Sequence, residues 1–64
     1  MKPFSQLVLE IRAKNGLSMK DFAKICNVSI QTIYNIENEL ATPTRTTKAK
    51  IMLVINELEK KETL

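Results

Sequence analysis

The sequence predicts an all-α protein, a compact bundle of four to five helices in a single domain that covers residues 1–64. Apolar residues recur every three or four positions along most of the chain, which is the period of an amphipathic helix. One glycine and two prolines leave few sharp turns, so short connections between helices are expected. No segment alternates between polar and apolar residues for long enough to form a strand.

The first helix is predicted over residues 4–15. Pro3 near its start and Gly16 after its end fit the residue preferences of helix termini. Its apolar residues follow the spacing i, i+3, i+4 and i+7, which places them on one face. The side chains expected on this buried face are Phe4, Leu7, Val8 and Ile11.

The second helix is predicted over residues 18–25. Ser18 is a suitable N-cap, and Asp21 follows at the N3 position, where a capping box has Glu or Gln. Asn27 tolerates a left-handed conformation, so the turn after this helix is placed there. We interpret Cys26, the single cysteine, as a small buried side chain. The apolar face comprises Met19, Phe22, Ala23 and Cys26.

The third helix is predicted over residues 29–38, with Ser29 as its N-cap. Its apolar residues recur at a spacing of three, and they are Ile30, Ile33 and Ile36. The opposite face is polar and comprises Gln31, Thr32, Tyr34 and Asn35.

The last helix is predicted over residues 44–61, after a loop over residues 38–42 that ends at Pro43. Thr44 or Thr46 is expected to cap it. The apolar stripe of this helix comprises Ile51, Val54, Ile55 and Leu58.

Met52 and Leu53 widen that stripe beyond what a single core contact requires. One explanation is that they contact a second copy of the chain in a homodimer. The alternative is that they close the core of the monomer. Either kind of packing would add to the stability of the folded domain, because a domain this short buries only about 60% of the surface that its unfolded chain exposes.

The charge of the chain is unevenly distributed. The formal net charge is +3. Residues 1–50 carry eight basic and four acidic residues, whereas residues 51–64 carry two lysines and three glutamates. The positive potential therefore lies in the first part of the chain, where we expect a polyanion to dock. Ordinary solubility is the alternative explanation for this excess.

Composition argues against several classes of protein. With no histidine and one cysteine, we expect no metal site, no disulfide within the chain and no cofactor. We find no nucleophile beside a base, no paired carboxylates and no phosphate-binding glycine loop, so neither enzymatic activity nor a small-molecule substrate is expected. The start lacks the apolar run of a signal peptide, and the longest apolar run, residues 51–55, is too short to span a bilayer. A soluble, cytoplasmic protein without a membrane partner is expected.

Two segments carry a resemblance to a known family. Residues 12–23 (RAKNGLSMKDFA) and residues 26–38 (CNVSIQTIYNIEN) resemble the two halves of the lambda-repressor-like helix-turn-helix found in phage repressors and Cro proteins. Pro43 stands where that family has a proline before the next helix. The similarity covers about residues 5–58. It implies a bacterial or phage-encoded transcriptional regulator, of the repressor type found in phages, plasmids and mobile elements, that binds double-stranded DNA as a homodimer.

The resemblance also implies roles for individual residues. In the third helix, Gln31 and Asn35 would contact bases, because their amides can donate and accept in the pattern that suits adenine. Ile30 would either meet a thymine methyl group or pack inward. The residues expected to contact phosphates are Ser18, Lys20, Ser29, Thr32, Tyr34, Thr44, Arg45 and Lys48, with a helix-bracing role as the alternative for Tyr34.

An ion pair between Arg12 of the first helix and Glu37 at the end of the third is also implied by the resemblance. The position of Glu37 supports this independently. It follows Ile33 and Ile36 on the side that faces the core, where a carboxylate needs a partner.

The sequence departs from the family pattern at three places. Met19 stands where the family often has a phosphate-binding glutamine, and Asn27 where the turn usually has glycine. After the third helix the family often continues with glycine and basic residues, but residues 39–42 (ELAT) contain no basic side chain. We therefore keep a second hypothesis, in which the same fold serves as a small antirepressor or protein-interaction module that binds another repressor protein.

Overall fold

A computed structural model describes residues 2–60, and within them it contains four α-helices and no strand. These are α1 (Phe4–Lys14), α2 (Met19–Cys26), α3 (Ile30–Glu37) and α4 (Arg45–Lys60). The prediction of an all-α bundle is confirmed, and the described helix bounds differ from the predicted ones by one residue at most. Residue 61, where the last helix was expected to end, lies outside the described part of the chain.

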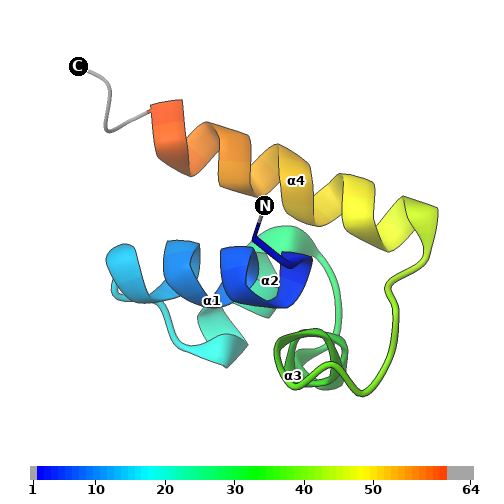
Figure 1. The fold of residues 1–64 in the computed structure, drawn as a ribbon. Coiled ribbons are helices and arrows are strands. Elements are labelled where there is room, and N and C mark those ends of the chain that lie inside the picture. Colours follow the sequence, from blue (N-terminus) through cyan, green and yellow to red (C-terminus); the bar gives the residue numbers. More distant parts are fainter. Residues whose placement is uncertain (1, 61–64) are drawn as a thin grey trace.

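The four helices form a small bundle in which the long helix α4 covers one side (Figure 1). Both α3 and α4 pack against α1 and α2. The segment between α3 and α4 runs along the edge of the molecule and returns the chain to the opposite side of the bundle (Figure 1). The exposed faces of α2 and α3 are thereby left uncovered by α4.

The core lies where the four helices meet. The largest side chains that are fully buried there are Phe22, Ile33, Ile51, Ile55 and Val8. Every helix contributes at least one of them, so the core depends on all four elements at once. Cys26 is also buried, with 2% of its surface exposed, as expected for a small apolar side chain.

Hydroxyl side chains cap the starts of three helices. The Ser18 Oγ accepts a hydrogen bond from the backbone N–H of Asp21 at 3.1 Å, and the Ser29 Oγ accepts one from Thr32 at 3.1 Å. Thr44 settles the choice left open for α4, because its Oγ1 accepts the N–H of Thr47 at 3.2 Å. Each cap satisfies a backbone donor that has no partner within the helix.

Left-handed residues end the first three helices. They are Gly16 (φ 63°), Asn27 (φ 60°) and Glu39 (φ 57°). After each helix the backbone closes with a pair of hydrogen bonds, for example Leu17 N to Arg12 O at 2.9 Å and Gly16 N to Ala13 O at 3.1 Å. Glycine and asparagine were expected at such positions, whereas a glutamate was not.

Two apolar residues, Ile30 and Leu53, are more exposed than their place in the apolar pattern of their helices would suggest. Ile30 was placed on the stripe with Ile33 and Ile36, but it is 51% exposed while the other two are buried. Six residues rotate an α-helix by about 600°, so Ile30 and Ile36 lie about 120° apart and cannot face the same core. Met52 is half-buried against the domain's own core, whereas Leu53 is 66% exposed.

Among the described residues, no helix is both long and apolar enough to cross a membrane. The same residues contain no group of three His, Cys, Asp or Glu side chains that could hold a metal ion.

Candidate nucleic-acid interface

Helices α2 and α3 form a helix-turn-helix whose turn is fixed by its own backbone. Asn27 adopts the left-handed conformation predicted for it, with φ 60° and ψ 43°. The Val28 N–H then donates to the carbonyl of Ala23 at 3.0 Å, and Ser29 begins the cap of α3. Only two residues, Asn27 and Val28, separate the end of α2 from that cap. The start of α3 is therefore held in a fixed orientation by α2.

A buried ion pair joins α3 to α1. Arg12 donates from Nε to Glu37 Oε2 at 2.8 Å and from Nη2 to Glu37 Oε1 at 2.9 Å. The Glu37 side chain is only 4% exposed, and that of Arg12 is 18% exposed. The hydrogen bonds that Arg12 donates to Glu37 raise the pKa of Arg12, although burial acts in the opposite direction. The bidentate geometry fixes the angle between the two helices as well as pairing the charges.

Arg12 also braces the turn that precedes α2. Its Nη1 donates to the carbonyl of Leu17 at 3.1 Å, one residue before the Ser18 cap. One guanidinium thus contacts the end of α3 and the chain leading into α2. This side chain ties both helices of the motif to α1.

The outward face of α3 begins with exposed side chains. Ile30, Gln31 and Tyr34 are all exposed, with 51% and 45% of the surface of Ile30 and Tyr34 open to solvent. The inward alternative for Ile30 is therefore ruled out. These residues lie in the first turns of the helix, which is the part that reaches base edges when a helix enters the major groove.

Gln31 and Asn35 are hydrogen-bonded to each other across this face. The Gln31 Nε2 donates to Asn35 Oδ1 at 2.9 Å. The bond uses one of the two Gln31 amide protons and leaves its carbonyl oxygen and second proton for another partner. The structure thus presents a braced pair of amides rather than two independent ones.

Family comparison matches residues 8–61 to a helix-turn-helix family of the lambda-repressor-like, XRE type. The chain belongs to this family. No curated protein and no solved structure matches the chain. Membership makes it a DNA-binding helix-turn-helix regulator, in a family of DNA-binding proteins that are typically non-enzymatic.

The helix-turn-helix domain brings several of the predicted DNA-contacting residues together. Thr32 and Asn35 of α3 line one groove with Thr44, the cap of α4. The Thr32 Oγ1 and the Ser29 Oγ are also 2.8 Å apart. Hydroxyl groups near the starts of α3 and α4 therefore line the same groove as Asn35. Ser18 and Lys20 lie separately, at the start of α2.

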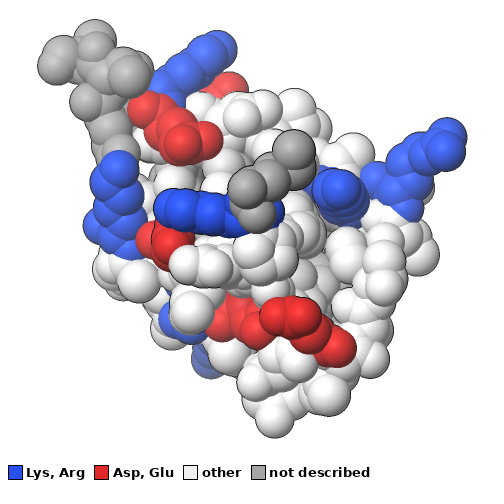
Figure 2. Space-filling model, viewed as in Figure 1, with Lys and Arg blue, Asp and Glu red and all other residues white. Residues whose placement is uncertain are grey.

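Basic side chains gather where α4 begins (Figure 2). Arg45 and Lys48 are exposed in its first turns. The Lys48 ammonium lies 5.4 Å from the centre of the Phe4 ring, a cation–π contact between α4 and the start of α1. This contact holds one predicted phosphate-binding cation near the domain surface.

Two further contacts were not predicted from the sequence. The Ser5 hydroxyl donates to Glu39 Oε2 at 3.1 Å, and the Asn38 Nδ2 donates to the carbonyl of Tyr34 at 2.9 Å. The second bond covers a carbonyl at the end of α3 with a nearby amide, and a polar residue after a helix is a modest signal for it. The first joins residues 34 positions apart, and nothing in the sequence pairs them.

Proposed function

We propose that this helix-turn-helix domain recognises a specific double-stranded DNA sequence through α3 and represses transcription, as a regulator of a phage, plasmid or other mobile element. The observation that carries the proposal is the hydrogen bond from Gln31 to Asn35 on the exposed face of α3. A brace of this kind reduces the freedom that a glutamine side chain loses on binding. The assignment as a repressor rests on the family resemblance.

Gln31 is the main base-reading residue in this proposal. Its free carbonyl oxygen accepts from adenine N6, and its second amide proton is donated to adenine N7. Asn35 holds the amide in place and offers its own Nδ2 to a neighbouring base edge. The exposed Ile30 suits contact with a thymine methyl group.

The phosphate contacts proposed here come from two kinds of group. Ser18, Ser29 and Thr44 stand at helix N-termini, where the backbone favours an anion. The remaining side chains in this role are Lys20, Thr32, Tyr34, Arg45 and Lys48.

A homodimer is also proposed, with Leu53 at its contact. Leu53 lines an apolar groove with Ile25, Val54 and Leu58, on the side of the molecule formed by α2 and α4. Met52 contributes less to this contact than the sequence suggested, because it packs against the core of its own domain. Pairing would place two copies of α3 on successive turns of the DNA.

Binding of DNA from a random-sequence library tests the base-reading role. The wild-type protein selects its preferred site, and fluorescence anisotropy then compares Gln31→Ala with Gln6→Ala. Gln6 is a matched control, because it also donates to the side chain four residues on, Glu10 Oε2, at 2.9 Å on an exposed face of α1. Gln31→Ala is expected to cost about 1–3 kcal/mol and to relax selectivity at one base pair, whereas Gln6→Ala changes neither.

Lys48→Ala separates docking from base reading. It is expected to weaken binding to all sequences alike and to lower the slope of log K against log salt by about one unit. If Gln31→Ala and Lys48→Ala both fold and both leave DNA affinity unchanged, α3 does not face DNA. The antirepressor hypothesis, in which this surface binds another repressor protein, would then replace the proposal.

A further inference from the structure

Glu39 occupies a position that is unfavourable for a glutamate. It is the left-handed residue that ends α3, with φ 57°, and the Glu39 N–H donates to the carbonyl of Ile36 at 3.2 Å. Residues with a Cβ adopt this conformation at a cost, which the glycine often found here in the family avoids. This chain therefore places a charged side chain where glycine would be free of strain.

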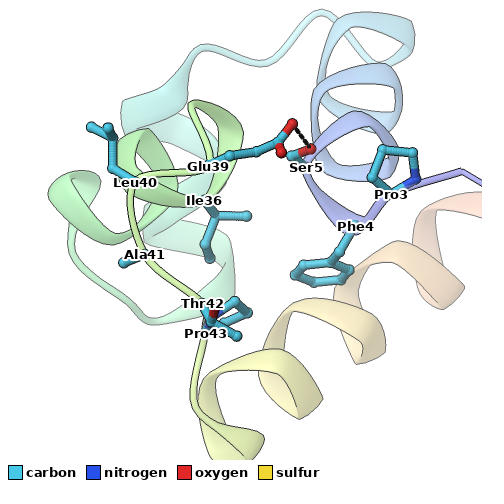
Figure 3. A pocket seen from close by; sticks show the side chains of 9 residues that line it. All are labelled: Pro3, Phe4, Ser5, Ile36, Glu39, Leu40, Ala41, Thr42 and Pro43. Carbon is cyan, nitrogen blue, oxygen red and sulfur yellow. Dashed lines mark hydrogen bonds between the residues drawn. The ribbon is translucent and has the colours of Figure 1, made fainter.

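The Glu39 side chain is held in place by α1. The Ser5 hydroxyl, in a residue only 9% exposed, donates to Glu39 Oε2 at 3.1 Å. Figure 3 shows Glu39 extended from the end of α3 toward Ser5, at the rim of a cleft that is also lined by Phe4, Ile36 and Pro43. The carboxylate thus has a fixed position at the edge of the candidate interface.

That position follows the proposed base-reading pair in the chain. Glu39 lies four residues after Asn35 and two residues beyond Glu37, the last residue of α3. The next residue, Leu40, donates its N–H to the carbonyl of Asn35 at 2.8 Å. The segment that follows Leu40 lines the groove shared by Asn35 and Thr44. Phosphates beside the base-reading pair would therefore come close to Glu39.

The charge of Glu39 is not neutralised by a basic side chain of the described residues, whereas the charge of Glu37 is. Glu37 is buried and pairs with Arg12, whereas Glu39 is exposed and its carboxylate accepts from the uncharged Ser5 hydroxyl. Figure 2 shows acidic side chains over this part of the molecule, apart from the basic group at the start of α4. At low salt the field of such a charge extends over about 10 Å or more, far enough to reach phosphates at the interface.

We propose that Glu39 is a negative determinant of DNA affinity, a fixed carboxylate that repels the phosphate backbone beside the base-reading pair and keeps the complex weak and readily reversible. This inference rests on the proposed DNA binding through α3. Through water, one charge facing one or two phosphates at about 8 Å changes affinity about twofold to sixfold. Removing the charge should therefore tighten binding without adding any contact.

Glu39→Gln tests the charge alone. The amide oxygen of glutamine can still accept from Ser5, and the backbone conformation is unchanged, so the melting temperature should stay close to that of the wild type. Glu59→Gln is the matched control. It gives the same increase in net charge on the exposed surface of α4, outside the apolar groove of Leu53 and fourteen residues or about 21 Å along the helix from Arg45. Glu39→Gly is a second variant that removes the charge and the strain together.

Binding to the selected DNA site is measured for all four proteins at low and high salt. In about 50 mM salt, Glu39→Gln and Glu39→Gly are expected to bind about twofold to sixfold more tightly than the wild type and than Glu59→Gln. This difference in DNA affinity should become smaller in about 300 mM salt, where the screening of charges is stronger.

Equal affinity of Glu39→Gln and Glu59→Gln at low salt would overturn the inference, and so would a gain in affinity that does not fall with salt. In either case a loss of affinity in Gln31→Ala would show that the proposed function still stands. Absence of sequence-selective binding by the wild type would overturn both.

Discussion

Breaking the ion pair between Arg12 and Glu37 is expected to destabilise the whole domain. In Glu37→Ala the Arg12 guanidinium loses both bonds to the carboxylate and keeps the Leu17 carbonyl as its partner, although its side chain is only 18% exposed. Removing one partner of a buried pair costs about 3–5 kcal/mol, because the surviving charge stays desolvated. At about 0.05–0.15 kcal/mol per residue, the total free energy of unfolding of a 64-residue domain is about 3–10 kcal/mol.

Thermal unfolding followed by circular dichroism measures this effect. For a domain of this size, 1 kcal/mol shifts the melting temperature by about 4–8 °C, so Glu37→Ala should melt at least about 12 °C below the wild type or be unfolded at 25 °C. Glu10→Ala is the control. It also removes one carboxylate from an ion pair, with Lys2, but both side chains are well exposed and the expected effect is small.

The double variant Arg12→Met, Glu37→Leu tests why Glu37→Ala is destabilised. The cause is either the loss of the ion pair itself or the buried charge of Arg12 that is left without a carboxylate. The double variant should recover much of the stability lost in Glu37→Ala, since apolar residues of similar volume can replace a buried pair at little cost. If Glu37→Ala melted within about 4 °C of the wild type, the pair would contribute no more than an exposed one, and the reasoning from its burial would be wrong.

Two further predictions concern alkaline pH and assembly. Burial raises the pKa of the Cys26 thiol to about 11, from an ordinary value near 9.0. As the pH rises, the thiol should therefore ionise in the unfolded chain before it ionises in the folded protein. The free energy of unfolding should fall as the pH rises from about 9 to 11. Urea unfolding measures the free energy of unfolding of the wild type and of Cys26→Ala. The difference between them should narrow by about 2–3 kcal/mol over that pH range, whereas a constant difference would contradict the raised pKa of Cys26. Leu53→Glu should convert dimers to monomers in sedimentation experiments, and Leu40→Glu should not, although Leu40 and Leu53 are 65% and 66% exposed. An unchanged mass for folded Leu53→Glu would refute the proposed contact.

The helices could be predicted from the sequence because their determinants lie close together in the chain. Ser18 and Ser29 cap helices through backbone groups three residues away, and Asn27 ends α2 through its own conformational preference. Such features depend on residue type and spacing alone. The position of Gln31 and Asn35 on the outward face of α3 also follows from the period of the helix, and the family resemblance gave it a functional meaning.

Contacts between distant residues could not be obtained in the same way. Arg12 and Glu37 are 25 positions apart, and the family resemblance supplied their pairing. Ser5 and Glu39 are ordinary surface residue types, and neither has a pattern that points to the other. The left-handed glutamate was missed for a related reason, since the geometry of a helix end depends on the path of the following loop as well as on the residue itself.

Tyr34 gives the chain a built-in optical probe. It is the only tyrosine, there is no tryptophan, and it lies 45% exposed on α3 between the two amides proposed to read bases. Its ultraviolet emission therefore originates at one known point on the recognition surface. Stacking or close approach of a nucleobase would change that emission, so titrations with unlabelled DNA can be followed without attaching a dye to this protein of 7.3 kDa.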